Sequence, residues 1–333
     1  MKKISLLLIL LSQILITGVA TSGLFKPSKP EMLADEVLVP EKQFEVKTFG
    51  VKQLADVNYA KNNKRIKGAE KKVVIPFYTI TFPKKHRLEK SKYEKKKGIT
   101  IETNIVGISE QSYKDLSNWG YDNLCEKLQT AGFEIVEKNT VIENPVYQNM
   151  KSKKEKNKKG YSRYFPTDMK AGGQFSTSMT TPKLMDAFQA DVLGVYLSLD
   201  PMARQRDQTK FVTKKTKIGQ AVNVSHLDAY ISSMKDSKCN RGSCYSKANG
   251  SISFINPIHS DMAFGHVADD TNTKANVAGH AATTLLRLGG FGAKTSYTFR
   301  YVLNADEEKY ILAAQDALDK TNSKLVDELI SIY

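Results

Sequence analysis

The sequence has few of the residues that bind metals or act as nucleophiles. Its 333 residues include three cysteines and five histidines, and Cys239 and Cys244 form the one closely spaced cysteine pair. It has no nucleophile elbow, and Ser225-His226 has no obvious third partner for a catalytic triad. The helical two-histidine zinc motif is also absent. We therefore expect a protein that is not an enzyme and has no catalytic, metal-binding or cofactor-binding residues.

One group of possible metal ligands remains in the second half of the chain. It consists of His259, Asp261, His266 and His280, whose spacing fits no closed zinc signature. An exported metal-dependent hydrolase that uses these four residues is the enzymatic alternative, and loop or surface histidines are the simpler interpretation. Residues 288–295 lack the glycine that a phosphate-binding loop needs before its lysine.

The sequence also lacks an apolar run long enough to cross a membrane. Lys2 and Lys3 precede an apolar stretch that ends at Ile16, and small residues follow it. A spanning helix needs roughly 20 apolar residues, whereas a basic start, a short apolar core and a small-residue exit are typical of a secretory signal peptide. We expect residues 1–20 to be removed just after Ala20 during export. No cysteine stands at this exit, which argues against a lipid-anchored lipoprotein.

Export would place the cysteines in an oxidising compartment. Cys239 and Cys244 bracket the turn-like tetrapeptide Asn-Arg-Gly-Ser, so we predict a local disulfide that closes the tip of a hairpin. The alternative of a metal site needs further donors at set spacings, and the sequence shows no second pair. Cys125 falls on the buried side of a predicted helix and is expected to be a small core residue.

Positive charge is in excess. The net charge is +15 and the estimated pI is 9.4, which favours contact with anionic surfaces. The lysines are concentrated at residues 84–97 and 151–159, beside structured segments, so solvated loops are the simpler interpretation. The alternative is one basic rim that binds anionic envelope polymers or the outer-membrane surface; no specific nucleic acid is expected. The candidate contacts are Lys84, Lys85, Arg87, Lys151, Lys153, Lys154, Lys156, Lys158 and Lys159.

A strand–helix–strand unit organises the rest of the chain. Residues 72–82 are rich in β-branched and aromatic side chains, as strands are. Apolar residues then recur at three- and four-residue steps over 113–131, which predicts a helix with one buried face. Gly132 suits the end of that helix, and residues 133–137 alternate like a strand. Because such a crossover is right-handed, we expect both strands in one sheet. A short helix is predicted up to Met150.

The flanking segments complete an α+β fold. Residues 21–70 form an extended lead-in. Thr181-Pro182 opens a short helix, and residues 190–199 form a central strand that Pro201 ends. Residues 203–300 are expected to hold an antiparallel hairpin insertion. Asn304 begins a final amphipathic helix that packs back on the sheet.

The order of these elements resembles the amino-terminal domain of TolB and the periplasmic domain of the curli secretion channel. The similar motifs are the Val-Val-Ile-Pro-Phe strand at 73–77, the segment Gly-Phe-Glu-Ile-Val-Glu-Lys at 132–138 and the Ala-Asp-Val-Leu-Gly strand at 190–194. The resemblance runs in order from about residue 72 to 330. It implies a mixed β-sheet with packed helices, a two-layer or three-layer α/β sandwich, over residues 71–333.

The same resemblance implies a function without catalysis. It points to a cell-envelope protein of a Gram-negative bacterium, located in the periplasm or at the outer membrane, that acts in assembly or secretion through oligomerisation or docking to other envelope proteins. This sequence lacks the lipid-bearing cysteine of the channel members and differs from them in this respect. The strands predicted within 203–300 do not have uniformly apolar outward faces, which favours a soluble periplasmic protein.

Overall fold

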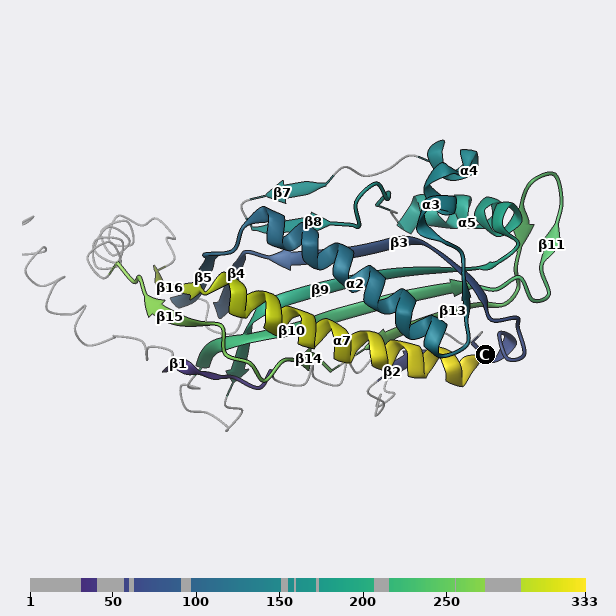
Figure 1. The fold of residues 1–333 in the computed structure, drawn as a ribbon. Coiled ribbons are helices and arrows are strands. Elements are labelled where there is room, and N and C mark those ends of the chain that lie inside the picture. Colours follow the sequence, from purple (N-terminus) through teal and green to yellow (C-terminus); the bar gives the residue numbers. More distant parts are fainter. Residues whose placement is uncertain are drawn as a thin grey trace, which may run out of the picture.

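The structure is a computed structural model. It describes residues 31–40, 57–59, 63–90, 97–150, 155–158, 160–171, 174–206, 216–254, 256–272 and 295–333. Strands form a ten-stranded mixed sheet, a four-stranded sheet and a two-stranded hairpin, with helices packed on the main sheet (Figure 1). The predicted α+β class is therefore confirmed. Among the described residues, no helix has both the length and the hydrophobicity that a membrane crossing requires.

The main sheet has the strand order β2-β13-β10-β9-β3-β8-β7. Its strands are β2 (Val57–Tyr59), β3 (Lys72–Pro83), β7 (Lys156–Lys158), β8 (Tyr161–Tyr164), β9 (Asp191–Arg206), β10 (Thr216–Ser232) and β13 (Asn249–Phe254). Three more strands join it from the side: β1 (Glu31–Val37) and β14 (Ile258–His259) pair with β10, and β6 (Glu134–Ile135) pairs with β3. The long strands β9 and β10 lie in its centre.

The second sheet has the order β15-β16-β5-β4, and the two-stranded hairpin pairs β11 with β12. Their strands are β4 (Lys85–Lys90), β5 (Lys97–Val106), β15 (Gly265–Asp269), β16 (Thr295–Ala305), β11 (Lys238–Cys239) and β12 (Cys244–Tyr245). The helices are α2 (Glu110–Thr130), α3 (Lys138–Glu143), α4 (Pro145–Gln148), α5 (Gln174–Phe188) and α7 (Glu307–Ile332), with a short 3-10 turn, η2 (Asn63–Arg65).

The predicted strand–helix–strand unit is present. Strand β3 runs parallel to β6, with Lys72 opposite Glu134 and Val73 opposite Ile135, and α2 connects them. Gly132 has a φ of +83°, the left-handed conformation that ends a helix at little cost only for glycine. The Ser109 side chain accepts a hydrogen bond from the Ser112 backbone N–H and caps the other end of α2. The early strands therefore share one sheet, as the sequence predicts.

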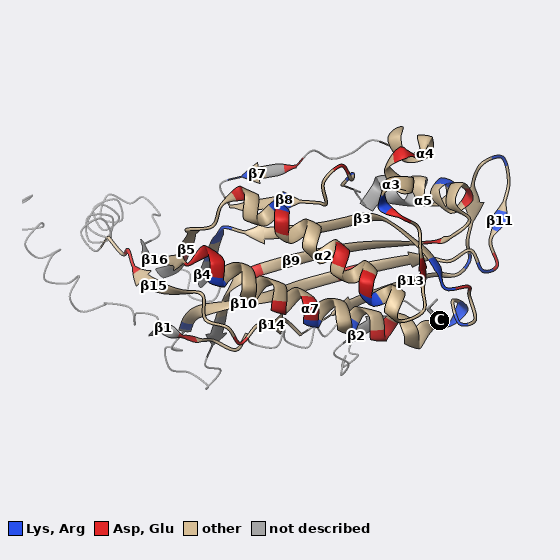
Figure 2. Ribbon diagram, viewed as in Figure 1, with Lys and Arg blue, Asp and Glu red and all other residues tan. Residues whose placement is uncertain are grey.

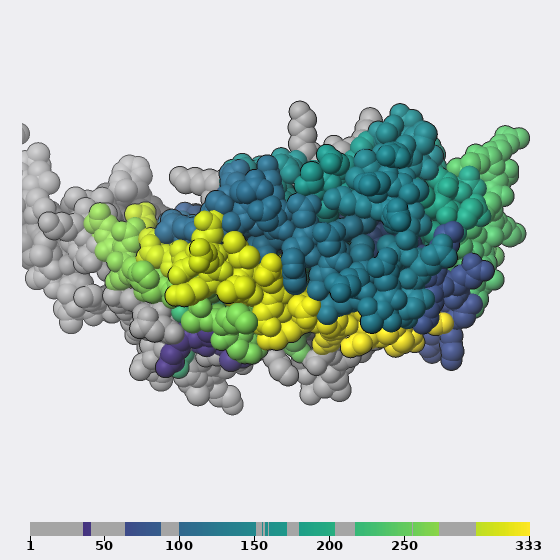
Figure 3. All heavy atoms as spheres, viewed as in Figure 1, coloured from purple at the N-terminus to yellow at the C-terminus, as the bar shows by residue number. Residues whose placement is uncertain are grey.

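Helices α2 and α7 lie side by side over one face of the main sheet (Figures 1 and 3). The Asn322 side-chain amide of α7 donates a 2.9 Å hydrogen bond to the Gly120 carbonyl oxygen of α2. Between the helices and the sheet lies the largest core cluster, which includes Ile80, Leu124 and Leu318, all fully buried. This packing confirms that the carboxy-terminal helix covers the sheet.

The opposite face of the main sheet is covered at one end by the small helices. Phe77 and Val192 of the sheet pack with Tyr147 of α4 and Leu184 of α5 in a second, separate core cluster. The Tyr147 hydroxyl donates a 3.0 Å hydrogen bond to the Pro76 carbonyl oxygen. The molecule therefore has three layers at this end of the sheet.

Two prolines behave differently from the prediction. Strand β9 continues through Pro201 to Arg206, because the β9–β10 ladder shifts register at this position and the β3 ladder has already ended at Ser198. Proline has no backbone N–H to donate, and no ladder hydrogen bond is needed at this position. Pro182 lies inside α5, which begins eight residues earlier at Gln174, and so does not open the helix.

Two further local predictions need correction. The lysine-rich segment after β3 is not a loop throughout: Lys85–Lys90 is an edge strand paired with β5. The short helix predicted up to Met150 is divided into α3 and α4, because Asn144 adopts an extended conformation and its side chain caps α4.

Candidate functional site

The first predicted lysine cluster lies next to the described part of the second. The Lys84 backbone N–H donates to the Gly160 carbonyl oxygen at 3.0 Å, and the Lys84 ammonium lies 3.1 Å from the Asn157 side-chain oxygen. Lys158 is exposed on β7 near this junction. Lys156 also lies in β7, although its side chain is outside the described part, and Lys151, Lys153, Lys154 and Lys159 lie outside the described residues altogether.

Acidic side chains offset the positive charge at this junction. Lys84 lies 3.9 Å from Glu110, and the Glu102 carboxylate lies 3.4 Å from Lys85 and 3.9 Å from Arg87. Lys and Arg are spread over many elements and interspersed with Asp and Glu (Figure 2). At this junction, Lys84, Lys85 and Arg87 are therefore each within 4 Å of a carboxylate.

The histidine group is not assembled into a metal centre within the described residues. His259 Nε2 lies 3.3 Å from Asp261 Oδ1, and Lys320 Nζ lies 3.5 Å from the other oxygen of the same carboxylate. His266 Nε2 is 3.4 Å from the Asn304 side-chain nitrogen on β16. His280 lies outside the described part of the chain. No set of three ligand atoms in that part includes these histidines.

The cysteines form the most distinctive local structure. Cys239 and Cys244 are joined by a disulfide and pair directly across β11 and β12, which confirms the predicted link. We call residues 238–245 the cystine hairpin. It projects from one end of the molecule, next to the label β11 in Figure 1.

The turn chemistry explains why this disulfide forms. Arg241 and Gly242 both have positive φ values, +48° and +79°, as a two-residue type I′ hairpin turn requires. Asn240 and Ser243 exchange backbone hydrogen bonds of 2.9 Å and 3.3 Å. In an antiparallel ladder the next pair is then a non-hydrogen-bonded one, where the strands approach closely. The two cysteines occupy that position, with Cα atoms 3.9 Å apart.

The segments that flank the hairpin are fixed to the main sheet. The Asp191 carboxylate, at the start of β9, accepts hydrogen bonds from the Met234 backbone N–H at 2.5 Å and from the Tyr333 hydroxyl at 2.7 Å. Burial raises the pKa of Asp191 above its ordinary value, although these hydrogen bonds act in the opposite direction. The Ser233 N–H also donates to the Ala248 carbonyl oxygen at 3.0 Å. The segments on both sides of the hairpin are therefore held to the main sheet, and its tip is closed by the disulfide.

One face of the hairpin packs against the core and the other faces solvent. Cys244 is fully buried and belongs to the second core cluster with Met185 and Phe188 of α5. Cys239 shares the face of Cys244 but lies at its exposed edge, whereas Lys238 and Tyr245 pair on the other face and are exposed, Tyr245 by 65%. Residues 238–245 include Lys238 and Arg241 and no acidic residue. The solvent-facing side is thus basic and aromatic.

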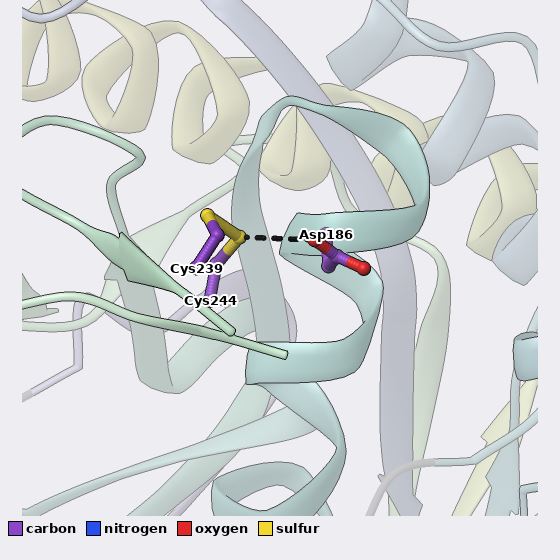
Figure 4. Close-up of side chains that lie close together, drawn as sticks. All are labelled: Asp186, Cys239 and Cys244. Carbon is purple, nitrogen blue, oxygen red and sulfur yellow. Dashed lines mark hydrogen bonds between the residues drawn. A yellow bond between two sulfur atoms is a disulfide. The ribbon is translucent and has the colours of Figure 1, made fainter. Parts of the chain in front are cut away.

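Helix α5 brings a carboxylate to the disulfide. Asp186 Oδ1 lies 3.4 Å from Cys244 Sγ, and one ligand atom from each of Asp186, Cys239 and Cys244 lies within 4.8 Å of the others (Figure 4). Sequence reasoning missed Asp186, because it precedes the cysteines by more than fifty residues and reaches them only through the packing of α5 on the hairpin. The spacing of the cysteines gives no sign of it.

The third cysteine is chemically separate. Cys125 is partly buried on α2 and packs against the main core, as its position in the sequence predicts. Burial raises the pKa of its thiol to about 12, so it is protonated at neutral pH and a poor nucleophile.

In comparisons with known proteins, no family model, curated protein or solved structure matches the chain.

Proposed function

We propose that this protein is an exported, non-enzymatic component of a bacterial cell envelope that acts by docking to other envelope proteins or to copies of itself. The cystine hairpin is the observation that carries the proposal. Its outer face is exposed, the segment leading into it is anchored through the hydrogen bond of Met234 to Asp191, and its tip is closed by a disulfide. A surface element that is already held in one conformation loses little entropy on binding, which favours affinity.

The side chains of the hairpin suit a protein partner. Tyr and Arg are enriched at protein interfaces, and Tyr245 and Arg241 are both exposed here. With Lys238 on the same hairpin and no acidic residue in it, we infer an acidic partner surface with an apolar contact for Tyr245.

Export is part of the same proposal. Disulfides persist in the periplasm and are rare in the cytosol, so the Cys239–Cys244 bond supports an exported chain. The basic and apolar residues of 1–20 support it independently. We also propose kinship with TolB and the curli secretion channel, and this kinship is supported by the short sequence motifs alone.

Cell fractionation combined with crosslinking tests this function. A photo-crosslinking amino acid would replace Tyr245 in the full chain, and the matched control would carry it at Leu312, an exposed position on α7. We expect the chain in the periplasmic or outer-membrane fraction, with Cys239 and Cys244 protected from alkylation by their disulfide, and a discrete crosslinked product from position 245 alone. A cytosolic chain, or equal products from both positions, would contradict the proposal.

A further inference from the structure

We propose that reduction of the Cys239–Cys244 disulfide creates a three-ligand site for a divalent metal ion of the zinc class. The ligands would be the two cysteine thiolates and the Asp186 carboxylate. This inference concerns the same hairpin as the proposed function but goes beyond it, because it assigns a ligand that protein docking does not need.

The positions of the ligand atoms carry the inference. In a tetrahedral zinc site, Zn–S distances of about 2.3 Å and Zn–O distances of about 2.1 Å place sulfur and oxygen about 3.5 Å apart. Asp186 Oδ1 already lies 3.4 Å from Cys244 Sγ. The two sulfur atoms need to separate from bonding distance to about 3.8 Å, the separation that two thiolates have on one zinc ion. The third ligand therefore stands in place before the disulfide opens.

The surrounding structure supports binding of an ion. Asp186 is on α5 and Cys244 is buried against that helix, so two ligands are fixed by the core. Cys239 is exposed, which gives the ion a path from solvent and leaves a fourth coordination position open to water. Tight packing at Cys244 and exposure at Cys239 together make a site that is preorganised on one side and accessible on the other.

The donor set selects the kind of metal. Two thiolates and one carboxylate suit borderline-soft ions such as Zn²⁺, whereas Mg²⁺ and Ca²⁺ prefer oxygen ligands. In the oxidised protein the sulfurs are joined to each other and carry no thiolate charge. Metal binding should therefore depend on the redox state of this one bond.

The chemistry balances with a dithiol as reductant. The dithiol transfers two electrons and two protons, the Cys239–Cys244 bond breaks to give two thiols, and the dithiol is oxidised to its own disulfide. Zn²⁺ then binds both sulfurs as two protons are released to solvent.

The test compares oxidised and reduced full-length mature protein. Protein reduced with dithiothreitol and desalted without oxygen would be dialysed against Zn²⁺, beside a sample kept oxidised. Subtracting the oxidised sample removes binding elsewhere, such as at His259. We expect one additional zinc equivalent in the reduced protein, and thiolate-to-metal charge-transfer absorption when Co²⁺ replaces Zn²⁺. Equal zinc content in the two samples would overturn the proposal.

Three variants test the location of the site. Asp186→Ala should weaken zinc binding by the reduced protein by at least about tenfold, because it removes a ligand that structure already fixes. Glu126→Ala is the matched control, since Glu126 is an exposed acidic residue on α2, and should leave affinity unchanged. Cys125→Ser should also have no effect. Unchanged affinity in Asp186→Ala would rule out this ligand set, whether or not the hairpin docks to a partner.

Discussion

His86 Nε2 lies 2.8 Å from Asp200 Oδ1, and this contact joins the second sheet to the main sheet. His86 is on β4, at the edge of the four-stranded sheet, and Asp200 is on β9, in the centre of the ten-stranded sheet. The same carboxylate oxygen accepts a 2.9 Å hydrogen bond from the Met202 backbone N–H, which fixes its position. The lysine-rich edge strand is therefore attached to the core through a specific polar contact.

Replacing His86 by alanine should loosen this attachment. We expect His86→Ala to lower the free energy of unfolding by about 1 kcal/mol or less, because the mostly buried Asp200 carboxylate loses its ion-pair partner but keeps the hydrogen bond from the Met202 backbone N–H. Urea denaturation of the mature chain measures this change in the free energy of unfolding. His226→Ala, at an exposed position on β10, is the control and should change stability little. Equal effects of the two substitutions would show that the contact contributes nothing.

Gly120 should not tolerate a methyl group although it lies in a helix. Glycine to alanine in a helix interior normally stabilises by about 1 kcal/mol. A Cβ on Gly120, however, would lie 2.6 Å from the Tyr78 hydroxyl oxygen, which is fully buried between β3 and α2. We expect Gly120→Ala to destabilise the protein by about 1–3 kcal/mol in thermal or urea unfolding. Gly160→Ala, where a Cβ meets nothing within 4 Å, should be neutral; a stabilising Gly120→Ala would refute the packing described here.

Glu307 should make stability depend on acid pH. Its carboxylate accepts hydrogen bonds from the Ser112 hydroxyl at 2.6 Å and the Ser109 backbone N–H at 2.7 Å, which lower its pKa to about 2. A lowered pKa means that this stabilisation is complete above the unfolded value of about 4.3 and is lost as pH falls towards 2.

Thermal unfolding of Glu307→Gln measures this effect. The variant should melt below the wild type at pH 7, and the difference should shrink between pH 5 and pH 2, where the native carboxylate becomes protonated. Glu126→Gln, at an exposed site on α2, controls for the loss of a charge. A difference in melting temperature that is constant with pH would contradict the assigned cause.

The disulfide should protect the hairpin from proteolysis. In the chain-entropy picture, closing a loop of about six residues stabilises by about 2 kcal/mol, or roughly thirtyfold in the equilibrium for local opening. We expect the double variant Cys239→Ser/Cys244→Ser to be cut by trypsin after Arg241 at least about tenfold faster. Cleavage after Lys127, within α2, provides the internal control and should not change. Equal rates at Arg241 would mean that the disulfide does not hold the hairpin.

Elements whose sequence signals lie within a few residues could be predicted from the sequence. The β-branched run of β3, the period of α2 and Gly132 at its end act within a few residues, so they could be predicted. Pro201 misled because its effect depends on distant partners: the neighbouring strand β3 has stopped pairing and the β10 ladder shifts register there. A rule that proline ends a strand uses only the sequence, so it takes account of neither the end of the β3 pairing nor the register shift.

The candidate site divides in the same way. Cys239, Cys244 and the turn between them lie within six residues, and the predicted disulfide is confirmed. Asp186 arrives through tertiary packing of α5 and has no local signal. The lysine clusters were predicted as solvated, but Glu110 of α2 and Glu102 of β5 lie within ion-pair distance of Lys84 and Lys85 in the first cluster, so charge counting overestimates the positive charge there.

The most direct test of the account is the crosslinking yield from position 245 in intact cells, measured with the disulfide present and with Cys239→Ser/Cys244→Ser. We expect a discrete product with an envelope protein or a second copy of the chain when the hairpin is closed, and its loss of about tenfold or more when it is open. A product that is independent of the disulfide, or none from the closed hairpin, would contradict docking through this element.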